Sequence, residues 1–185
     1  MKRMRMLTVA ILVGVVSTTG GATVSAQDKN DVKVPGGLSF SEFKGYESWE
    51  FISLSKSDAA VAAILGNKAM IDAYKAGIPG NGKPFPDGAK MAKIHWARTQ
   101  SKTAPGPTTI AGSLHDVDFM VKDSKRFPDG GWGYGAFEYD AAKGTFTPAT
   151  AKSSPPQNND AKCGLGCHTI VKKQDYVFTE YAKRQ

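Results

Sequence analysis

The chain has little of the residues that most often hold metals, because its 185 residues include only two cysteines and three histidines. A structural zinc site usually needs four Cys or His ligands, and the two cysteines form one closely spaced pair with no second pair. Internal repeats and coiled-coil heptads are absent, and no block of Lys and Arg stands out. A nucleic-acid-binding protein would present a clustered basic face, so we expect no nucleic-acid partner.

Long apolar runs are also scarce, and the one at the N-terminus is too short to span a bilayer. Basic residues precede an apolar run from Met6 to Val16, and small and polar residues follow it up to Ala26. This order is typical of a secretory signal peptide, whereas a membrane-spanning helix needs about 20 apolar residues. The sequence therefore predicts a signal peptide at residues 1–26, with an uncleaved anchor as the alternative. The mature protein would begin at Gln27, without a membrane anchor, in the bacterial periplasm.

The formal charge of +7 becomes smaller once the signal peptide is set aside. Removing Lys2, Arg3 and Arg5 from the 24 basic residues leaves 21 against 17 acidic ones, a net charge of +4. Such a charge would attract an acidic redox partner, although an ordinary solvated surface is the simpler explanation. The length left is that of about one domain. We place this domain at residues 46–185, after a loose, polar N-terminal arm at residues 27–45.

The mature sequence is richer in predicted strands than in helices. Alternating or β-prone runs predict strands at residues 48–54, 91–99, 114–122, 132–140 and 175–181, and an apolar run at residues 61–65 fits a strand or a buried helix. Residues 67–76 predict a helix, with Asn67 as N-cap and Gly77 as the stop. We therefore predict a mainly β (α+β) fold, which is an antiparallel sheet with one or two helices.

The most informative motif, Cys163-Gly-Leu-Gly-Cys167-His168, lies near the C-terminus. Two thiols followed at once by an imidazole are typical of covalent haem attachment, in which each thiol adds to a vinyl group and the histidine ligates the iron. The alternative is a disulfide between Cys163 and Cys167, since an exported protein is in an oxidising compartment. The adjacent histidine favours haem, because a disulfide has no need of it.

The motif has one residue more than the usual C-x-x-C-H spacing. On a helix, residues i and i+4 face the same side much as i and i+3 do. Gly164 and Gly166 in the spacer can also reach backbone conformations that are barred to other residues. We therefore predict one covalent haem c, held by Cys163 and Cys167, with His168 as the ligand of its iron.

Several segments together resemble the cytochrome P-460 family, which includes the cytochromes c′-beta. They are F-M-V-K-D-S-K-R-F at residues 119–127, Gly131-Trp132 before an aromatic strand, and D-Y-V-F-T at residues 175–179 after the haem motif. The resemblance covers most of the mature chain, from about residue 49 to residue 181. It implies a mainly antiparallel β protein, a homodimer, and one c-type haem whose five-coordinate iron keeps an open position. The C-x-x-x-C-H spacing departs from the family pattern.

The resemblance also implies candidate residues for the open side of the haem. In cytochromes P-460 a lysine is cross-linked to the porphyrin, and Lys93 is the matching position. Asp118 falls near an acidic position of the family. In an extended chain Met91, Lys93 and His95 share one face, so His95 is a third candidate; a solvated lysine and a surface histidine are the plainer interpretations. We name Lys93, Asp118 and His95 as candidate catalytic residues.

Three functions stay open at this point. The first is an oxidoreductase that binds and oxidises hydroxylamine or a related small nitrogen species and passes the electrons on, with Asp118 or His95 moving protons. The second is a nitric oxide-binding protein of the cytochrome c′-beta type, which needs no cross-link. The third is a simple electron carrier, which would need a sixth iron ligand such as Met91 or Met120.

Overall fold

The structure is a computed structural model that describes residues 32–36, 38–157 and 161–184. The predicted signal peptide at residues 1–26 and the first part of the predicted arm, residues 27–31, lie outside the described residues. Within the part of the chain that is described, no helix combines the length and the apolar character that a bilayer crossing requires.

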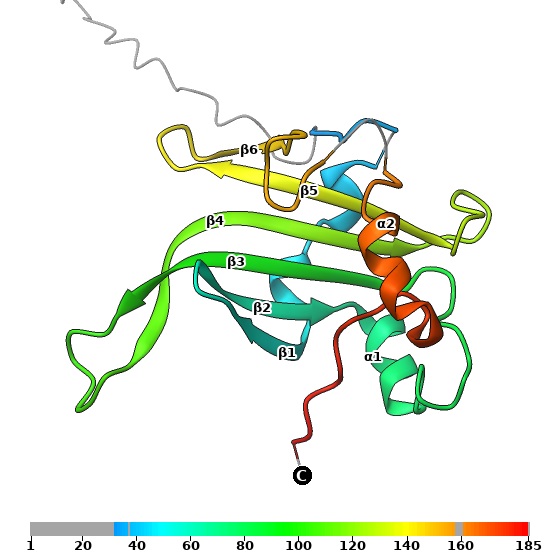
Figure 1. The fold of residues 1–185 in the computed structure, drawn as a ribbon, viewed down its shortest axis with the longest axis horizontal. Helices are drawn as coiled ribbons and strands as arrows, with labels where there is room; N and C mark the ends of the chain where they lie inside the picture. Colours follow the sequence, from blue (N-terminus) through cyan, green and yellow to red (C-terminus); the bar gives the residue numbers. More distant parts are fainter. Residues whose placement is uncertain (1–31, 37, 158–160, 185) are drawn as a thin grey trace, which may run out of the picture.

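Six strands form one antiparallel sheet whose spatial order follows the chain, so that each strand pairs with the next (Figure 1). The strands are β1 (Glu50–Lys56), β2 (Ala60–Gly66), β3 (Lys90–Gln100), β4 (Thr109–Lys122), β5 (Trp132–Asp140) and β6 (Thr145–Pro148). The predicted mainly β, antiparallel fold is confirmed. The run at residues 61–65, which fitted either a strand or a helix, belongs to β2, whereas β6 was not predicted.

The predicted helix is α1 (Lys68–Lys75). It begins as expected, because the side chain of Asn67 accepts a hydrogen bond from the backbone N–H of Met70 at 3.0 Å. Gly77 follows its end with a φ of 85°, a conformation that favours glycine. The other helical segments are short: η2 (Phe40–Phe43), η3 (Tyr46–Ser48), α2 (Leu165–His168) and η4 (Thr169–Gln174).

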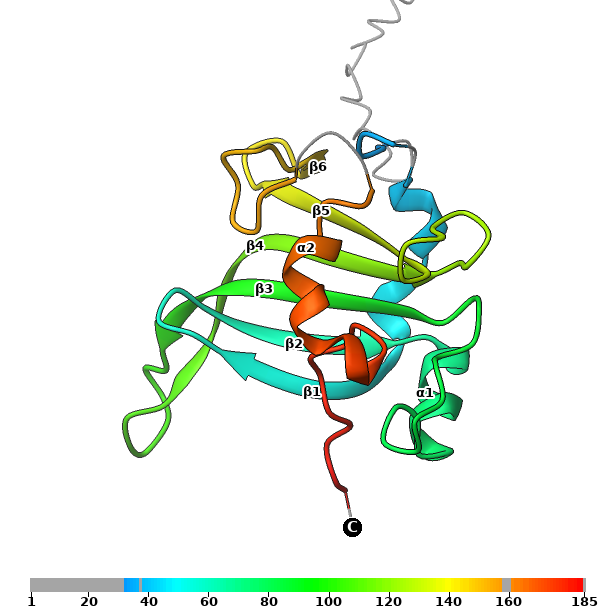
Figure 2. The ribbon, with the colours of Figure 1, turned by 45° about the vertical axis from the view of Figure 1, so that its right-hand side comes forward.

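The two faces of the sheet are covered by different parts of the chain. The segment with α2 and η4 crosses one face in front of β3 to β5, while the N-terminal segment lies behind the sheet (Figure 2). Behind the sheet, Phe119 of β4 packs against Phe40 and Phe43 of η2, with ring centroids 5.2 Å and 4.1 Å apart. Phe137 of β5 joins them, its ring centroid 5.0 Å from that of Phe40.

The prediction of a loose N-terminal arm is wrong for its described part. Val34, Leu38, Phe40 and Phe43 are at most 2 % exposed and form part of the main core. The sequence did not predict this burial. Polar and glycine residues separate the apolar ones, which follow neither a strand nor a helix period. A boundary at residue 46 therefore divides one packed unit.

The prediction of a strand at residues 175–181 is also wrong. Asp175 and Tyr176 have φ angles of 50° and 63°, and two successive left-handed residues turn the chain instead of extending it. Beyond this turn individual hydrogen bonds hold the segment. In one of them the hydroxyl of Tyr74 donates to the carbonyl of Thr179 at 2.7 Å. The β-prone composition of this segment includes Val177, which is buried against the sheet at 1 % exposure.

Candidate haem site

A cavity of about 700 Å³ lies between the sheet and the segment that carries the cysteine motif. Cofactor sites are commonly of this size. From the sheet its lining includes alternate residues of three strands: Met91, Lys93 and His95 of β3, Asp116, Asp118 and Met120 of β4, and Tyr134 and Ala136 of β5. Cys163, Cys167 and His168 line it from the other side. The predicted common face of Met91, Lys93 and His95 is therefore the cavity face.

The cysteine motif forms a helical turn over the cavity. The N–H of His168 donates to the carbonyl of Gly164 at 3.0 Å, which closes a turn of four residues. Both cysteines are thiols, and Cys163 donates a hydrogen bond from Sγ to the carbonyl of Pro156 at 3.6 Å. Cys163 precedes the N-cap of α2, so only Cys167 and His168 lie on the helix, yet both cysteines and His168 line the same cavity.

The spacer glycines have a different role from the one predicted. Gly164 has φ −67° and ψ −21°, a helical conformation open to any residue. Its role is spatial, because a Cβ at this position would lie 2.4 Å from Cγ of Tyr134. A Cβ at Gly166 would have no atom within 4 Å. Gly164 therefore lets the motif approach β5, and Gly166 has no such constraint.

His168 is oriented by the chain that follows it. Its Nδ1–H donates to the carbonyl of Tyr176 at 2.7 Å, which leaves Nε2 as the atom available to a metal. Burial lowers the pKa of His168, with a further lowering from the charge of Lys93, and the bond to Tyr176 opposes this. The imidazole is therefore held neutral, which is the form that binds a metal. The ring of Tyr134 lies 4.7 Å from the imidazole.

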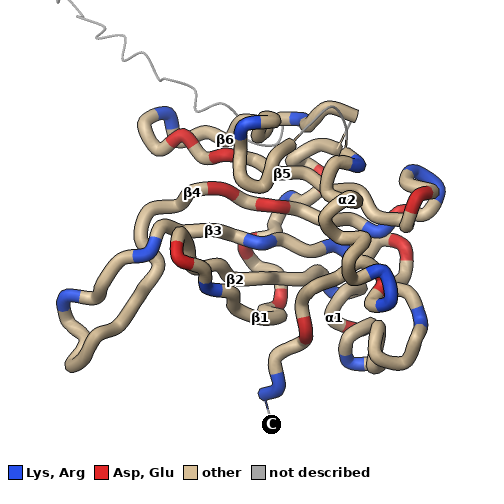
Figure 3. The backbone as a smooth tube through the Cα atoms, viewed as in Figure 1, with Lys and Arg blue, Asp and Glu red and all other residues tan. Residues whose placement is uncertain are grey.

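Lys93 and Asp118 face each other across the strand pair on the far side of the cavity. They are register partners of β3 and β4, and Figure 3 shows acidic positions of β4 beside a basic position of β3. Among the described residues, the ammonium of Lys93 forms no hydrogen bond, while its charge lowers the pKa of both Asp118 and His168. Lys93 is thus within electrostatic reach of both sides of the cavity.

Asp118 has a neighbouring cluster that the sequence did not indicate in full. His95 and His115 both hydrogen-bond to the carboxylate of Asp116 through Nδ1. His95 Nδ1 also lies 3.8 Å from Oδ2 of Asp118. Asp116 was not among the predicted residues; its i, i+2 spacing from Asp118 in a predicted strand was the available signal.

The pKa values of Asp116 and Asp118 are shifted in opposite directions. The pKa of Asp118 is raised to about 7, mainly by burial and also by the charge of Asp116, against the lowering effect of His95 and Lys93. Burial would also raise the pKa of Asp116, but the hydrogen bonds from His95 and His115 outweigh it and leave that pKa below its usual range. Such a split commonly separates a proton-exchanging group from a charged partner.

The donor set of the cavity fits a covalently attached haem. It offers two thiols for thioether bonds and one imidazole nitrogen, all from residues 163–168. On the opposite side it leaves two buried polar atoms, Oδ1 of Asp118 and the hydroxyl of Tyr134, without a hydrogen-bond partner among the described residues. Buried polar groups are normally satisfied, so these atoms indicate a site built to receive another group.

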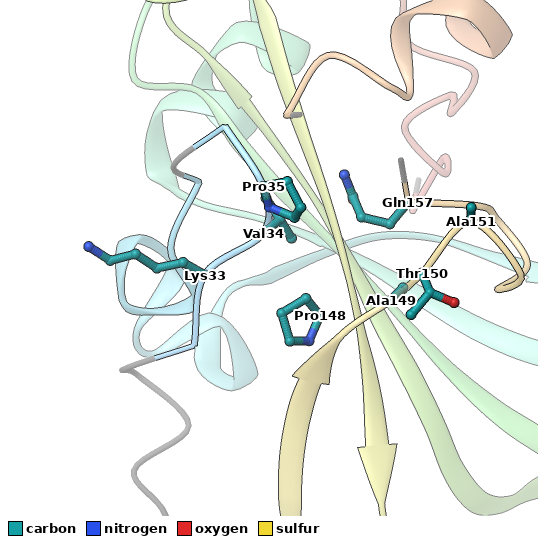
Figure 4. A pocket seen from close by; sticks show the side chains of 8 residues that line it. All are labelled: Lys33, Val34, Pro35, Pro148, Ala149, Thr150, Ala151 and Gln157. Carbon is teal, nitrogen blue, oxygen red and sulfur yellow. The ribbon is translucent and has the colours of Figure 1, made fainter. Parts of the chain in front are cut away.

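A second hollow of about 560 Å³ lies between the N-terminal segment and the chain after β6 (Figure 4). It is lined mainly by small and apolar residues, including Val34, Pro35 and Pro148, and none of its eight lining residues is Cys, His, Asp or Glu. The side chain of Lys33 extends away from Pro148 and Gln157. The chemistry of the molecule is therefore concentrated in the cavity beneath α2.

Comparison with known proteins agrees with this assignment. No curated protein matches the chain. The model of the family described as cytochrome P460 matches residues 43–179, which is most of the chain and includes all three catalytic candidates and the cysteine motif. This family implies a haem cofactor. The chain therefore belongs to the cytochrome P460 family.

Proposed function

We propose that the protein is a periplasmic cytochrome with one covalent haem c, and that it oxidises hydroxylamine or a related small nitrogen species. The observation that carries the proposal is Asp118. It is a partly buried carboxyl with a pKa of about 7 and one unpartnered oxygen among the described residues, and it lies in the same cavity as the cysteine motif. A cavity that only held a gas molecule would not need such a group.

The residues that hold the haem follow from the cavity lining. Cys163 and Cys167 form the thioether bonds, and His168 offers Nε2 to the iron. Lys93, which lines the far side without a hydrogen bond among the described residues, is the residue that would bond to the porphyrin edge. When bound, the haem supplies an iron that takes up the electrons of the substrate.

Proton transfer falls to the β4 carboxyl groups. A base works best when its pKa is close to the working pH, and Asp118 meets this condition at neutral pH. It accepts a proton from the substrate. Asp116 stays ionised between its two histidines and keeps His95 turned toward the cavity. His95 in turn favours the ionised form of Asp118.

Electrons are passed to an acidic periplasmic redox partner. The motif itself reaches the surface, because Cys167 is exposed. The chain from residue 161 to residue 174 carries Lys162, Lys172 and Lys173 on its exposed side and contains no Asp or Glu. Such a charge would attract an acidic partner. The homodimer that the resemblance implies remains part of the proposal.

The test is hydroxylamine-dependent reduction of an artificial electron acceptor by the haem-loaded protein. Replacing Asp118 by Asn should lower the rate by about 100- to 10,000-fold, the usual contribution of a general base. The control is Asp72→Asn on the exposed surface of α1, where the side chain is 57 % exposed, and it should keep the parental rate. Equal rates in all three proteins would refute the role of Asp118.

The optical spectrum of the same protein separates the alternatives. A strongly red-shifted Soret band in the reduced state would support the bond from Lys93. An ordinary high-spin spectrum with nitric oxide binding and no turnover would favour a gas-binding protein. A low-spin, six-coordinate spectrum would favour an electron carrier, for which Met91 and Met120 both line the cavity.

A further inference from the structure

A buried ion pair joins the end of β4 to the turn after the haem motif. Nζ of Lys122 donates to both carboxylate oxygens of Asp175, at 2.7 Å and 2.9 Å. The two side chains are only 6 % and 11 % exposed. The residues lie far apart in the sequence, in the two segments that most resemble the cytochrome P-460 family, so the ion pair is the direct contact between those segments.

The pair is held by neighbours on both sides. Lys122 also donates to the carbonyl of Gly130 at 3.1 Å, and Asp175 accepts a hydrogen bond from the backbone N–H of Phe85 at 2.8 Å. Gly131, with φ 79°, leaves room for the lysine, because a Cβ there would lie 3.0 Å from its Nζ. Every polar atom of the carboxylate therefore has a fixed partner.

A buried ion pair of this kind is poor evidence for a purely stabilising role. Removing two charges from water costs about as much as their attraction returns, and apolar replacements are often as stable. The location is more informative, since Asp175 and Tyr176 are the two non-glycine residues with positive φ among the described residues. Such conformations are strained and persist only where the surroundings impose them.

The strained turn determines the position of the Tyr176 carbonyl. That oxygen accepts the hydrogen bond from Nδ1 of His168 at 2.7 Å. A partner of this kind orients a ligating imidazole and raises its basicity. Because Asp175 immediately precedes Tyr176, any rotation of its backbone would move this carbonyl away from the imidazole.

We propose that Lys122 and Asp175 are positioning residues that hold the Tyr176 carbonyl against His168 and thereby set the reduction potential of the haem. Neither residue touches the cavity. Their effect reaches the iron ligand through the turn at residues 175–176. A stronger donor ligand favours the oxidised metal, so the intact pair keeps the potential low.

The inference rests on the ligation of iron by His168 in the proposed function, and the two can fail separately. If the parental protein carries no covalent haem, the proposed function is refuted before any variant is compared. Parental protein with covalent haem, together with variants that have unchanged haem properties, would end the present inference alone.

The test uses haem-loaded Asp175→Asn. Asparagine keeps the size, tolerates a positive φ and can still accept from Phe85, but it loses the charge that fixes the turn. We expect the reduction potential to shift upward and the iron–histidine stretching frequency of the reduced protein to fall. If this variant does not fold, the double variant Lys122→Met, Asp175→Asn carries the test, because it leaves no unpaired buried charge.

A matched control is the ion pair of Arg126 and Glu42, which also joins distant segments. Its contacts are 2.6 Å and 3.0 Å, and neither residue lines the cavity. The double variant Glu42→Gln, Arg126→Gln should keep the parental potential and stretching frequency. A folded, haem-loaded Asp175 variant with parental values for both would overturn the proposal, as would equal shifts in the control.

Discussion

One face of the sheet is packed with aromatic rings, whereas the other carries ionisable side chains around a cavity. Asp118 and Phe119 show the contrast most directly, because they are neighbours on β4 and point to opposite faces. Phe119 is 1 % exposed and contacts four other aromatic rings. Asp118 has an oxygen without a partner among the described residues and a pKa of about 7.

The difference shows how one strand can serve stability and chemistry at once. On the core face each ring has close neighbours, so any loss of volume leaves a void. On the cavity face the groups are held by register partners such as Lys93 and by short-range electrostatics, and the space between them is left open. Changes on the two faces should therefore be separable by experiment.

The largest expected effect is on the core face. Phe119→Ala should lower the free energy of unfolding by about 3–5 kcal/mol, because it leaves a cavity within the aromatic cluster. Asp118→Asn should not destabilise the protein, since it replaces a partly buried carboxyl by a neutral group of the same size. Urea unfolding of both variants measures the difference, and equal losses would contradict the separation of the faces.

The next effect concerns the fit of the haem motif against β5. Gly164→Ala should overpack the contact with Tyr134, at a cost of about 1–3 kcal/mol, and should lower the fraction of protein with covalent haem. Gly166→Ala adds the same methyl group where no atom lies within 4 Å. Intact mass measurement gives the haem-loaded fraction of each. A similar loss of covalent haem in both variants would show that the contact of Gly164 with Tyr134 does not limit the fit of the motif.

A more gradual effect is the pH dependence of stability. The pKa of Asp118 is raised from 3.8 to about 7 in the folded protein, so between these values the folded state retains a proton that the unfolded state releases. Stability should therefore fall as the pH rises through this window, by at most about 1.4 kcal/mol per pH unit. Asp118→Asn should lack this component. Unfolding curves of parent and variant at pH 5 and pH 8 test the sign.

The smallest effect is on the pH profile of turnover. The rate should rise with pH as Asp118 ionises near pH 7. Replacing His95 by Gln removes a group that favours the ionised carboxylate, so the midpoint of the profile should move to higher pH, by about one unit or less. A midpoint that moves downward would show that His95 does not act on Asp118.

The cavity face could be predicted from the sequence because strand alternation holds from Met91 to His95 of β3. Met91, Lys93 and His95 share a face whatever the rest of the chain does, and the adjacent Cys167-His168 pair indicates haem by its chemistry alone. These signals are local. The structure brings them together in one cavity, and it adds Asp116, whose role depends on the two histidines that reach it from β3 and from its own strand.

The missed features depend on tertiary contacts. The sequence predicted that Val34 and Leu38 belong to a polar arm. Their burial comes from packing against the sheet and not from a local apolar period. The β-prone composition predicted a strand at Asp175 and Tyr176, whereas the observed turn is left-handed and its Asp175 side chain is paired with Lys122, far away in the sequence. No window of neighbouring residues contains that information.

The order of the strands along the chain has a consequence for assembly. Because every strand pairs with the next, the sheet forms from pairings between consecutive strands and is complete at Pro148, before the first cysteine of the motif. If the chain emerges N-terminus first, the sheet can thus fold before the segment with the cysteine motif has packed against it. Haem would then be enclosed last, as Cys163, Cys167 and His168 close over a cavity floor that is already in place.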